Sequence, residues 1–172
     1  MNRLSQQEFK EAPKVPVVIV LDNIRSQNNT GSVFRTADAF RLEAVFLCGI
    51  TATPPHREIT KTALGATESV TWKYFSDSSD ALKLLKSEGY TLLGIELTHE
   101  SISLNSFHPE KGRKYALVFG NEVYGIEDRI LSMLDGCIEI PQYGTKHSLN
   151  VSVAAGIVIW HTFSELGDFL LT

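Results

Sequence analysis

The chain has 172 residues, of which 43% are hydrophobic and 21% are charged, a composition typical of an ordinary soluble globular protein. This length supplies one domain with a substantial core and is short for two. Sixteen lysines and arginines against twenty aspartates and glutamates give a formal charge of −4. That balance argues against a protein that holds nucleic acid by bulk charge, although it leaves room for a local basic patch.

Several classes of protein are excluded or disfavoured by what the sequence lacks. No apolar stretch approaches the roughly 18 to 20 residues that a membrane span needs, and the polar start of the chain has no apolar signal core. We therefore expect a cytoplasmic protein with no membrane association. The two cysteines, Cys48 and Cys137, lie in apolar runs and are expected to be buried free thiols. Because no Cys/His cluster has ligand spacing, no metal site is expected.

Continuous apolar runs rich in Val, Ile and Leu recur along the chain and alternate with helical patterns. Runs without polar alternation predict strands that are covered on both faces, as in a parallel sheet. They lie at 15–22, 44–50, 91–97, 114–120 and 136–142, with a weaker sixth at 69–75.

The segments between these runs carry helical patterns. SVFRTADAFR has one apolar stripe, SSDALKLLKSEG is expected to begin at a Ser cap and to end at Gly89, and EDRILSMLDG is expected to end at Gly136. The last helix, roughly 148–165, is apolar nearly all round and must be buried in the core or against a partner subunit. We predict a lead-in over 1–14 and a single α/β domain of Rossmann-like type over 15–172.

A first candidate site follows the first predicted strand. Asn28–Gly31 is expected to form a turn before a helix that begins near Thr30 or Gly31, and ligands bind at such carboxyl ends of strands. The free N–H groups and dipole of a helix start attract anions, and Arg35 adds a charged fork suited to phosphate. Alternatively, Asn28–Gly31 is only a cap and Arg35 only pairs with Asp38.

A second candidate site is LVFGNEVYGI at 117–126. The strand ends in Gly120, the polar pair Asn121 and Glu122 follows, and then Gly125. The two glycines permit a close approach and a tight turn. The segment is neither a dinucleotide fingerprint nor a phosphate loop, and it is equally compatible with a plain junction between a strand and a loop.

A third candidate site spans 138–161. A strand runs into Pro141, a polar loop follows, and Ser148 is a natural N-cap for the final helix. Asn150 and Ser152 would then lie in the first turns among apolar residues, where polar groups need partners. Local backbone atoms are one possible set of partners.

Taken together, in this order and at these distances, the three segments resemble the signature motifs of the SpoU family, the TrmH-like tRNA/rRNA ribose 2′-O-methyltransferases of the SPOUT superfamily. The match covers about 15–163. It is carried by Asn29 and Arg35, by FGNE with Gly125, and by IPQYG followed by SLNVSVAAG.

The resemblance implies S-adenosyl-L-methionine as the cofactor and a ribose 2′-hydroxyl of tRNA or rRNA as the methyl acceptor. It also implies a Rossmann-like, mostly parallel α/β sheet with a deep C-terminal trefoil knot, and an obligate homodimer. The residues implied in the catalytic pocket are Asn29, Arg35, Glu122, Ser148 and Asn150. Those implied around the cofactor are Leu97, Gly120, Ile140, Ser148 and Leu149.

The resemblance implies that Arg35 activates the ribose hydroxyl, which must lose its proton during or after attack. A guanidinium with a pKa above about 12 is a poor base, because it has no free lone pair. We therefore expect Arg35 to hold an RNA phosphate and to stabilise the developing alkoxide. Asn29, Ser148 and Asn150 would orient the ribose and the arginine, while Glu122 would fix the pocket or Arg35.

Two questions stay open at this point. The first concerns a possible RNA-facing basic patch, whose candidates are equally compatible with solvated surface charge: Arg25, Arg41, Arg57, Lys61, Lys146 and His147. The second concerns the class of protein, because a SPOUT-fold RNA-binding protein without activity is an alternative. A Rossmann-like enzyme for a small nucleotide is another, although its glycine-rich fingerprint is missing.

Overall fold

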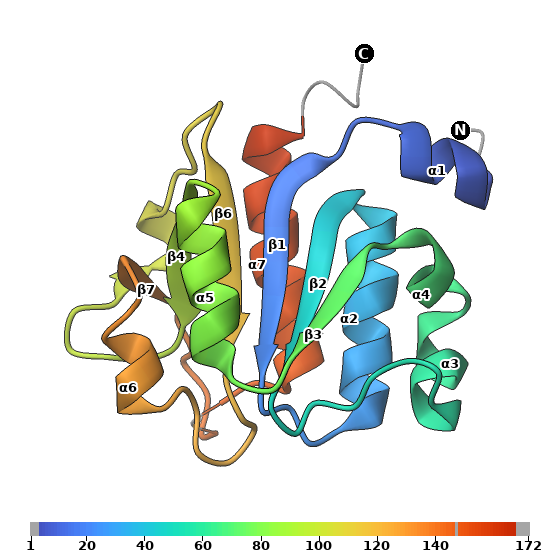
Figure 1. The fold of residues 1–172 in the computed structure, drawn as a ribbon. Helices are drawn as coiled ribbons and strands as arrows, with labels where there is room; N and C mark the ends of the chain where they lie inside the picture. Colours follow the sequence, from blue (N-terminus) through green and yellow to red (C-terminus); the bar gives the residue numbers. More distant parts are fainter. Residues whose placement is uncertain (1–3, 147, 168–172) are drawn as a thin grey trace.

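A computed structural model describes residues 4–146 and 148–167 of the chain. In these residues a seven-stranded sheet has the order β3-β2-β1-β6-β4-β7-β5, with every neighbouring pair parallel (Figure 1). The strands are β1 (Val15–Asp22), β2 (Leu42–Cys48), β3 (Trp72–Phe75), β4 (Tyr90–Ile95), β5 (Ile102–Ser103), β6 (Lys114–Phe119) and β7 (Gly136–Glu139). The helices are α1 (Gln6–Glu11), α2 (Gln27–Ala39), α3 (Arg57–Ala63), α4 (Ala66–Ser69), α5 (Ser78–Ser87), α6 (Asp128–Leu131) and α7 (Val151–Leu166), with a short 3₁₀ turn at Leu104–Ser106.

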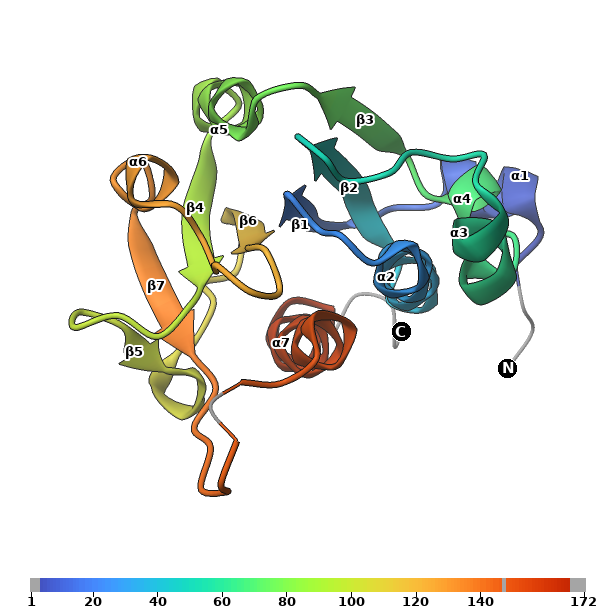
Figure 2. The ribbon, with the colours of Figure 1, turned by 90° about the horizontal axis from the view of Figure 1, so that it is seen from below.

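Helices cover both faces of the sheet, as the apolar runs predicted. Figure 2 shows α2 and α7 on one face and α5 and α6 on the other. The side chains of β1 alternate between these two layers, since Ile19 and Leu21 pack in the core with α2 and α7, whereas Val18 and Val20 pack with α5. A strand buried on both sides has no polar face, which explains its continuous apolar sequence.

The strand order reverses direction at the centre of the sheet, between β1 and β6. From β1 the chain moves outward through β2 and β3, and then crosses to the other half of the sheet, where β6 pairs with β1. Helix α2 follows β1 on one face, and α5 follows β3 on the other. Ligands of open α/β sheets bind at such a reversal of strand order.

Several predicted helix boundaries were wrong, because side chains other than the expected ones form the caps. Helix α2 begins at Gln27, capped by Ser26, so that Asn28–Gly31 lie inside its first turns. The cap of α5 is Asp77, not a serine. Asn150, not Ser148, caps α7, and its side-chain oxygen accepts hydrogen bonds from the N–H groups of Ser152 and Val153.

Other differences concern short elements. Helix α6 ends at Leu131, well before Gly136, and β5, α3 and α4 carried no periodic signal long enough to predict them. In the described part of the chain, no helix has the length and apolar character to cross a membrane.

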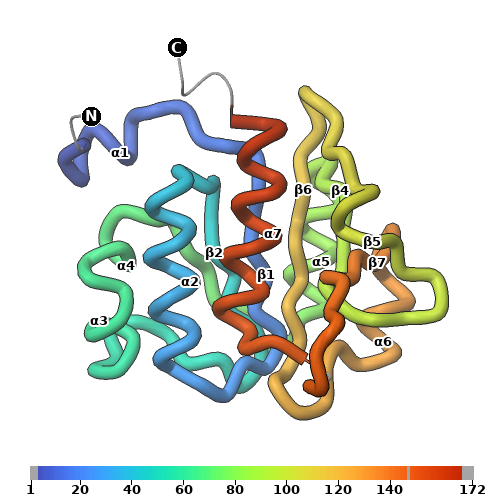
Figure 3. The backbone as a smooth tube through the Cα atoms, turned by 180° about the vertical axis from the view of Figure 1, so that it is seen from behind, coloured from blue at the N-terminus to red at the C-terminus, as the bar shows by residue number. Residues whose placement is uncertain are grey.

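Helix α7 is buried on one side only. The sequence predicted burial all round, in the core or against a partner subunit, and within a single chain this prediction is met on one side. Its buried residues face the core, including Ala155, Val158 and Ile159, while Val153 and Trp160 are about half exposed. The segment after β7 brings α7 back beside α2 (Figure 3). The trefoil knot implied by the resemblance stays a prediction.

Candidate active site

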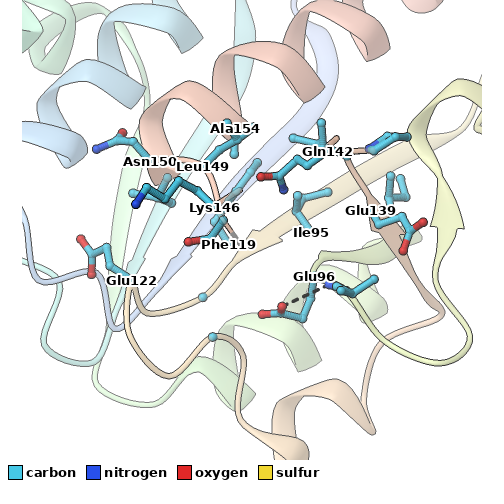
Figure 4. A pocket seen from close by; sticks show the side chains of 18 of the residues that line it. Ile95, Glu96, Phe119, Glu122, Glu139, Gln142, Lys146, Leu149, Asn150 and Ala154 are labelled. Atoms are coloured by element: carbon cyan, nitrogen blue, oxygen red, sulfur yellow. Dashed lines mark hydrogen bonds between the residues drawn. The ribbon is translucent and has the colours of Figure 1, made fainter. Parts of the chain in front are cut away.

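A pocket of about 930 Å³ opens at the carboxyl ends of β4, β6 and β7 (Figure 4). Its walls come from the segments that follow these strands and from the start of α7. Apolar side chains such as Phe119, Ile138 and Ala154 line it beside polar ones. All five residues expected around the cofactor line this pocket: Leu97, Gly120, Ile140, Ser148 and Leu149.

The turn after β6 explains the glycines of the second motif. The backbone N–H groups of Asn121 and Gly125 donate to each other's carbonyls at 3.0 and 2.9 Å, and Gly125 has a φ of 68°. A Cβ on Gly120 would lie 2.4 Å from the carbonyl carbon of Gly125. The two glycines therefore close a tight turn that lines the pocket, and the choice between a functional site and a plain junction stays a prediction.

Glu96, which directly follows β4, supports the same turn. Its carboxylate accepts hydrogen bonds from the backbone N–H groups of Leu97 at 3.1 Å and of Ile126 at 3.3 Å. Glu96 and Glu139 line the pocket but were missed from the sequence. A carboxylate at the end of an apolar run, as in GIEL and CIEIP, was the signal available for both.

The three motifs meet in a polar network beside the pocket. The Glu122 carboxylate accepts hydrogen bonds from the N–H groups of Arg25 at 2.9 Å and Ser26 at 3.0 Å, and from the Asn29 amide at 3.4 Å. The Asn29 side-chain oxygen accepts from the Asn150 amide at 3.1 Å. Glu122 and Asn150 also line the large pocket, and Asn29 lines a smaller hollow next to it.

The charge of Glu122 is favoured by this network. Burial alone would raise the pKa of its carboxyl, but hydrogen bonds from the Arg25, Glu122 and Ser26 backbones and from Asn29 outweigh burial and hold the pKa below its ordinary value. The protein's own carboxylate thus sits at the start of α2, where the sequence predicted an external anion. Thr30 and Gly31, expected at that start, are buried inside the helix.

Arg35 lies apart from the network. It is exposed, and its side chain makes no hydrogen bond or ion pair with another residue that the structure describes. Asp38, with which Arg35 would pair if the first motif were only a helix cap, accepts a hydrogen bond from Ser69 instead. Arg35 is six positions beyond Asn29, or about 9 Å along the helix axis, and it does not line the pocket.

The basic residues considered for RNA contact are dispersed. Lys146 lines the pocket, and Arg25 lines the hollow. Arg41 precedes β2 and lies at the opposite, amino end of the sheet, while Arg57 pairs with Glu58 at 3.9 Å. His147 lies outside the described residues.

Known proteins resemble this chain in both sequence and fold. The model of the SpoU rRNA methylase family matches residues 16–160. A 23S rRNA (guanosine-2′-O-)-methyltransferase, RlmB of Neisseria meningitidis serogroup B, is 32% identical over 147 residues, which cover 86% of this chain and 58% of that protein. A tRNA (guanosine(18)-2′-O)-methyltransferase of Mus musculus, TARBP1, is 33% identical over 84% of this chain but only 9% of its own length.

The solved structures show the same fold. A TrmH/SpoU tRNA modifying enzyme of A. aeolicus superimposes with a TM-score of 0.84 at 23% identity, covering 96% of this chain and 83% of that one. The SpoU methyltransferase AviRb of Streptomyces viridochromogenes, in complex with AdoMet, gives 0.80 at 19% identity, covering 90% and 62%. The chain spans about three fifths of the length of the first curated relatives that it matches. On the match over residues 16–160, the chain belongs to the SpoU rRNA methylase family.

Proposed function

We propose that this chain transfers a methyl group from S-adenosyl-L-methionine to a ribose 2′-hydroxyl of tRNA or rRNA. The observation that carries the proposal is the meeting of three distant motifs, through Asn29, Glu122 and Asn150, at the mouth of one pocket. Relatives named as rRNA and tRNA 2′-O-methyltransferases support it. The proposal places this methyl transfer in the cytoplasm, together with its tRNA or rRNA substrate.

The pocket suits the proposed cofactor in size and in charge. Its volume of about 930 Å³ lies in the range of roughly 300 to 1,000 Å³ found for small-molecule pockets. The described lining residues include the carboxylates of Glu96, Glu122 and Glu139 against the single cation of Lys146. Such an acidic surface favours a ligand with a sulfonium and an ammonium group.

The backbone around Leu97, Gly120, Ile140 and Leu149 would hold the adenosine part of the cofactor. The backbone of Gly125 and Ile126 fills the place that a Gly120 side chain would take, and the Gly120 main chain itself lines the pocket, where it would contact the cofactor. When bound, the cofactor supplies an electrophilic methyl group on sulfur. The remaining work of the chain is to place the ribose in line with that methyl group and to stabilise the alkoxide.

Binding of the RNA that accepts the methyl group is assigned to the polar network of Asn29, Glu122 and Asn150, and to Arg35. Asn29 is fixed by Glu122 and by Asn150, and its amide keeps one further N–H for the ribose. Ser148 is exposed and lines the pocket, which supports a role for its hydroxyl in orienting the ribose. Arg35, which has no partner among the described residues, retains its whole fork for a phosphate of the RNA.

A second copy of the chain is proposed to cover the exposed face of α7. Val153, Ile157 and Trp160 lie one turn apart and are 50%, 39% and 56% exposed, and Trp160 packs against Phe40 and Phe163. An apolar stripe of this kind on a surface helix is typical of an interface. Sedimentation analysis of Trp160→Glu should show monomers where the unaltered chain shows dimers, and an unaltered chain that sediments as a monomer would refute the homodimer.

Binding and transfer are tested separately. Isothermal titration should detect S-adenosyl-L-methionine binding, and ribose-methylation mapping across tRNA and rRNA, with and without the gene, should reveal a site that depends on it. No binding at millimolar cofactor would remove the methyltransferase proposal and favour an RNA-binding protein without activity.

Arg35→Lys keeps the positive charge but loses the two-pronged guanidinium, so turnover should fall severely while cofactor affinity stays unchanged. Near-normal turnover would contradict the bidentate role.

A further inference from the structure

Tyr143 is an aromatic side chain left almost entirely in solvent at the edge of the pocket. It is 95% exposed, and its residue belongs to the lining of the pocket. The loop that carries it follows β7 and extends away from the sheet (orange in Figure 2). Burying the apolar surface of such an aromatic ring against a bound ligand is favourable in free energy.

Tyr124 presents a second exposed ring from the other glycine loop of the site. It is 83% exposed and stands between Val123 and Gly125, which both line the pocket. Its backbone is held in the turn by hydrogen bonds, because the Asn121 side-chain oxygen accepts from the N–H groups of Val123 at 2.9 Å and Tyr124 at 3.1 Å. A ring on a fixed turn loses little entropy when a ligand packs on it.

The charge of the chain makes such rings significant for RNA. The formal charge is −4, three carboxylates line the pocket, and Lys146 is the cation among its described residues. With Lys146 as the cation among these lining residues, phosphate contacts at the pocket edge would release few counterions. Stacking of bases on aromatic rings does not depend on net charge, and it is the usual way in which proteins hold unpaired RNA bases.

We propose that Tyr143 and Tyr124 stack on unpaired bases next to the methylated ribose, so that the substrate presents its target in a single-stranded loop or bulge. The inference rests on the proposed function and deepens it. Both rings lie on loops that also border the cofactor pocket, which places a stacked nucleotide beside the site of transfer.

The test uses the full chain and a fluorescein-labelled, mixed-sequence single-stranded RNA of 15 nucleotides, alone and annealed to its complement. Tyr143→Ala should weaken single-strand binding roughly 5- to 150-fold, Tyr143→Trp should preserve binding, and Tyr143→Leu should behave like the alanine variant. Tyr124→Ala should show a loss of the same kind. The duplex should bind more weakly and show no effect of Tyr143→Ala. Ile50→Ala, which alters a side chain 64% exposed and outside the pocket lining, is the control and should bind normally.

Three further measurements separate stacking from other roles of Tyr143. The deficit of Tyr143→Ala should persist between 50 and 200 mM salt, whereas that of Lys146→Ala should shrink. Cofactor affinity should stay within about twofold, because a side chain in solvent does not hold the cofactor. The sedimentation coefficient should be unchanged.

Each contrary result has a distinct meaning. Equal RNA binding by Tyr143→Ala, or full rescue by Tyr143→Leu, would overturn stacking while leaving methyl transfer intact. A parallel loss of cofactor affinity would assign the ring to the cofactor, and a shift to monomers would assign it to a subunit interface. If the unaltered chain bound neither RNA nor cofactor, the proposed function would fall as well.

Discussion

Replacing Gly120 by alanine tests whether the turn after β6 is as tight as its geometry indicates. The added Cβ would lie 2.4 Å from the carbonyl carbon of Gly125, 2.5 Å from the nitrogen of Ile126 and 2.6 Å from the carbonyl oxygen of Gly125. All three are backbone atoms, so no side-chain rotation relieves the clash. The turn itself must move, and overpacking of this kind costs about 1 to 3 kcal/mol.

For a chain of this size that cost corresponds to a fall in Tm of roughly 3 to 10 °C, measurable by circular dichroism. Because the turn borders the pocket, we also expect cofactor affinity to fall roughly tenfold or more by isothermal titration. Gly144→Ala is a matched control, since Gly144 lines the same pocket but an added Cβ there meets nothing within 4 Å. If both variants melt and bind alike, the close approach at Gly120 does not constrain the site.

Three further predictions concern stability and reactivity. Glu122→Gln should lower the free energy of unfolding by about 1 kcal/mol at neutral pH. Because the folded pKa of this carboxyl is lowered, its contribution is present above the unfolded pKa of about 4.3 and is lost as pH falls through the folded pKa. In urea titrations the difference between the two chains should therefore shrink as the pH is lowered below the unfolded pKa, and a difference that grew on acidification would contradict this account. Gly31→Ala should lower the free energy of unfolding, although alanine normally stabilises a helix by about 1 kcal/mol relative to glycine, because the added Cβ would lie 2.0 Å from Thr62 Oγ1 and 2.4 Å from the backbone oxygen of Ile59. Adding Thr62→Ala should restore only part of the lost stability, because the backbone contact remains. A Gly31→Ala chain that is more stable than the unaltered one would refute this packing. Cys48 is fully buried, and burial raises its pKa to about 12, so Ellman's reagent should label it only after unfolding; rapid labelling of the native chain at Cys48 would contradict its burial.

The parallel sheet could be predicted because its strands are buried on both faces. Each central strand needs apolar side chains at every position, and that requirement is visible in the sequence without knowledge of the fold. Five of the seven strands in the described residues were predicted as continuous runs and a sixth as a weaker one. The two-residue β5 has no such signature, and neither does the four-residue α4.

Helix starts were harder to predict, because several residues near each one can serve as a cap. Ser148 and Asn150 both have capping side chains, and only the path of the chain into α7 selects Asn150. The same holds for Ser26 against Asn28–Gly31 at α2. Local sequence offers the candidates for a cap, while tertiary contacts such as that between Asn150 and Asn29 decide among them.

The arrangement around α2 bears on how the chain would hold an RNA phosphate. From the sequence, the start of this helix and Arg35 formed one anion site. In the structure Glu122 already accepts the N–H groups of Arg25 and Ser26, and a second anion there would meet like charge at close range. Arg35, farther along the helix and without a partner among the described residues, has no such competitor. Glu122 is hydrogen-bonded to Asn29, and Asn29 to Asn150, within the protein. Under the proposed function, the anion-binding role that the sequence analysis gave to the helix start would therefore fall to the guanidinium of Arg35 alone.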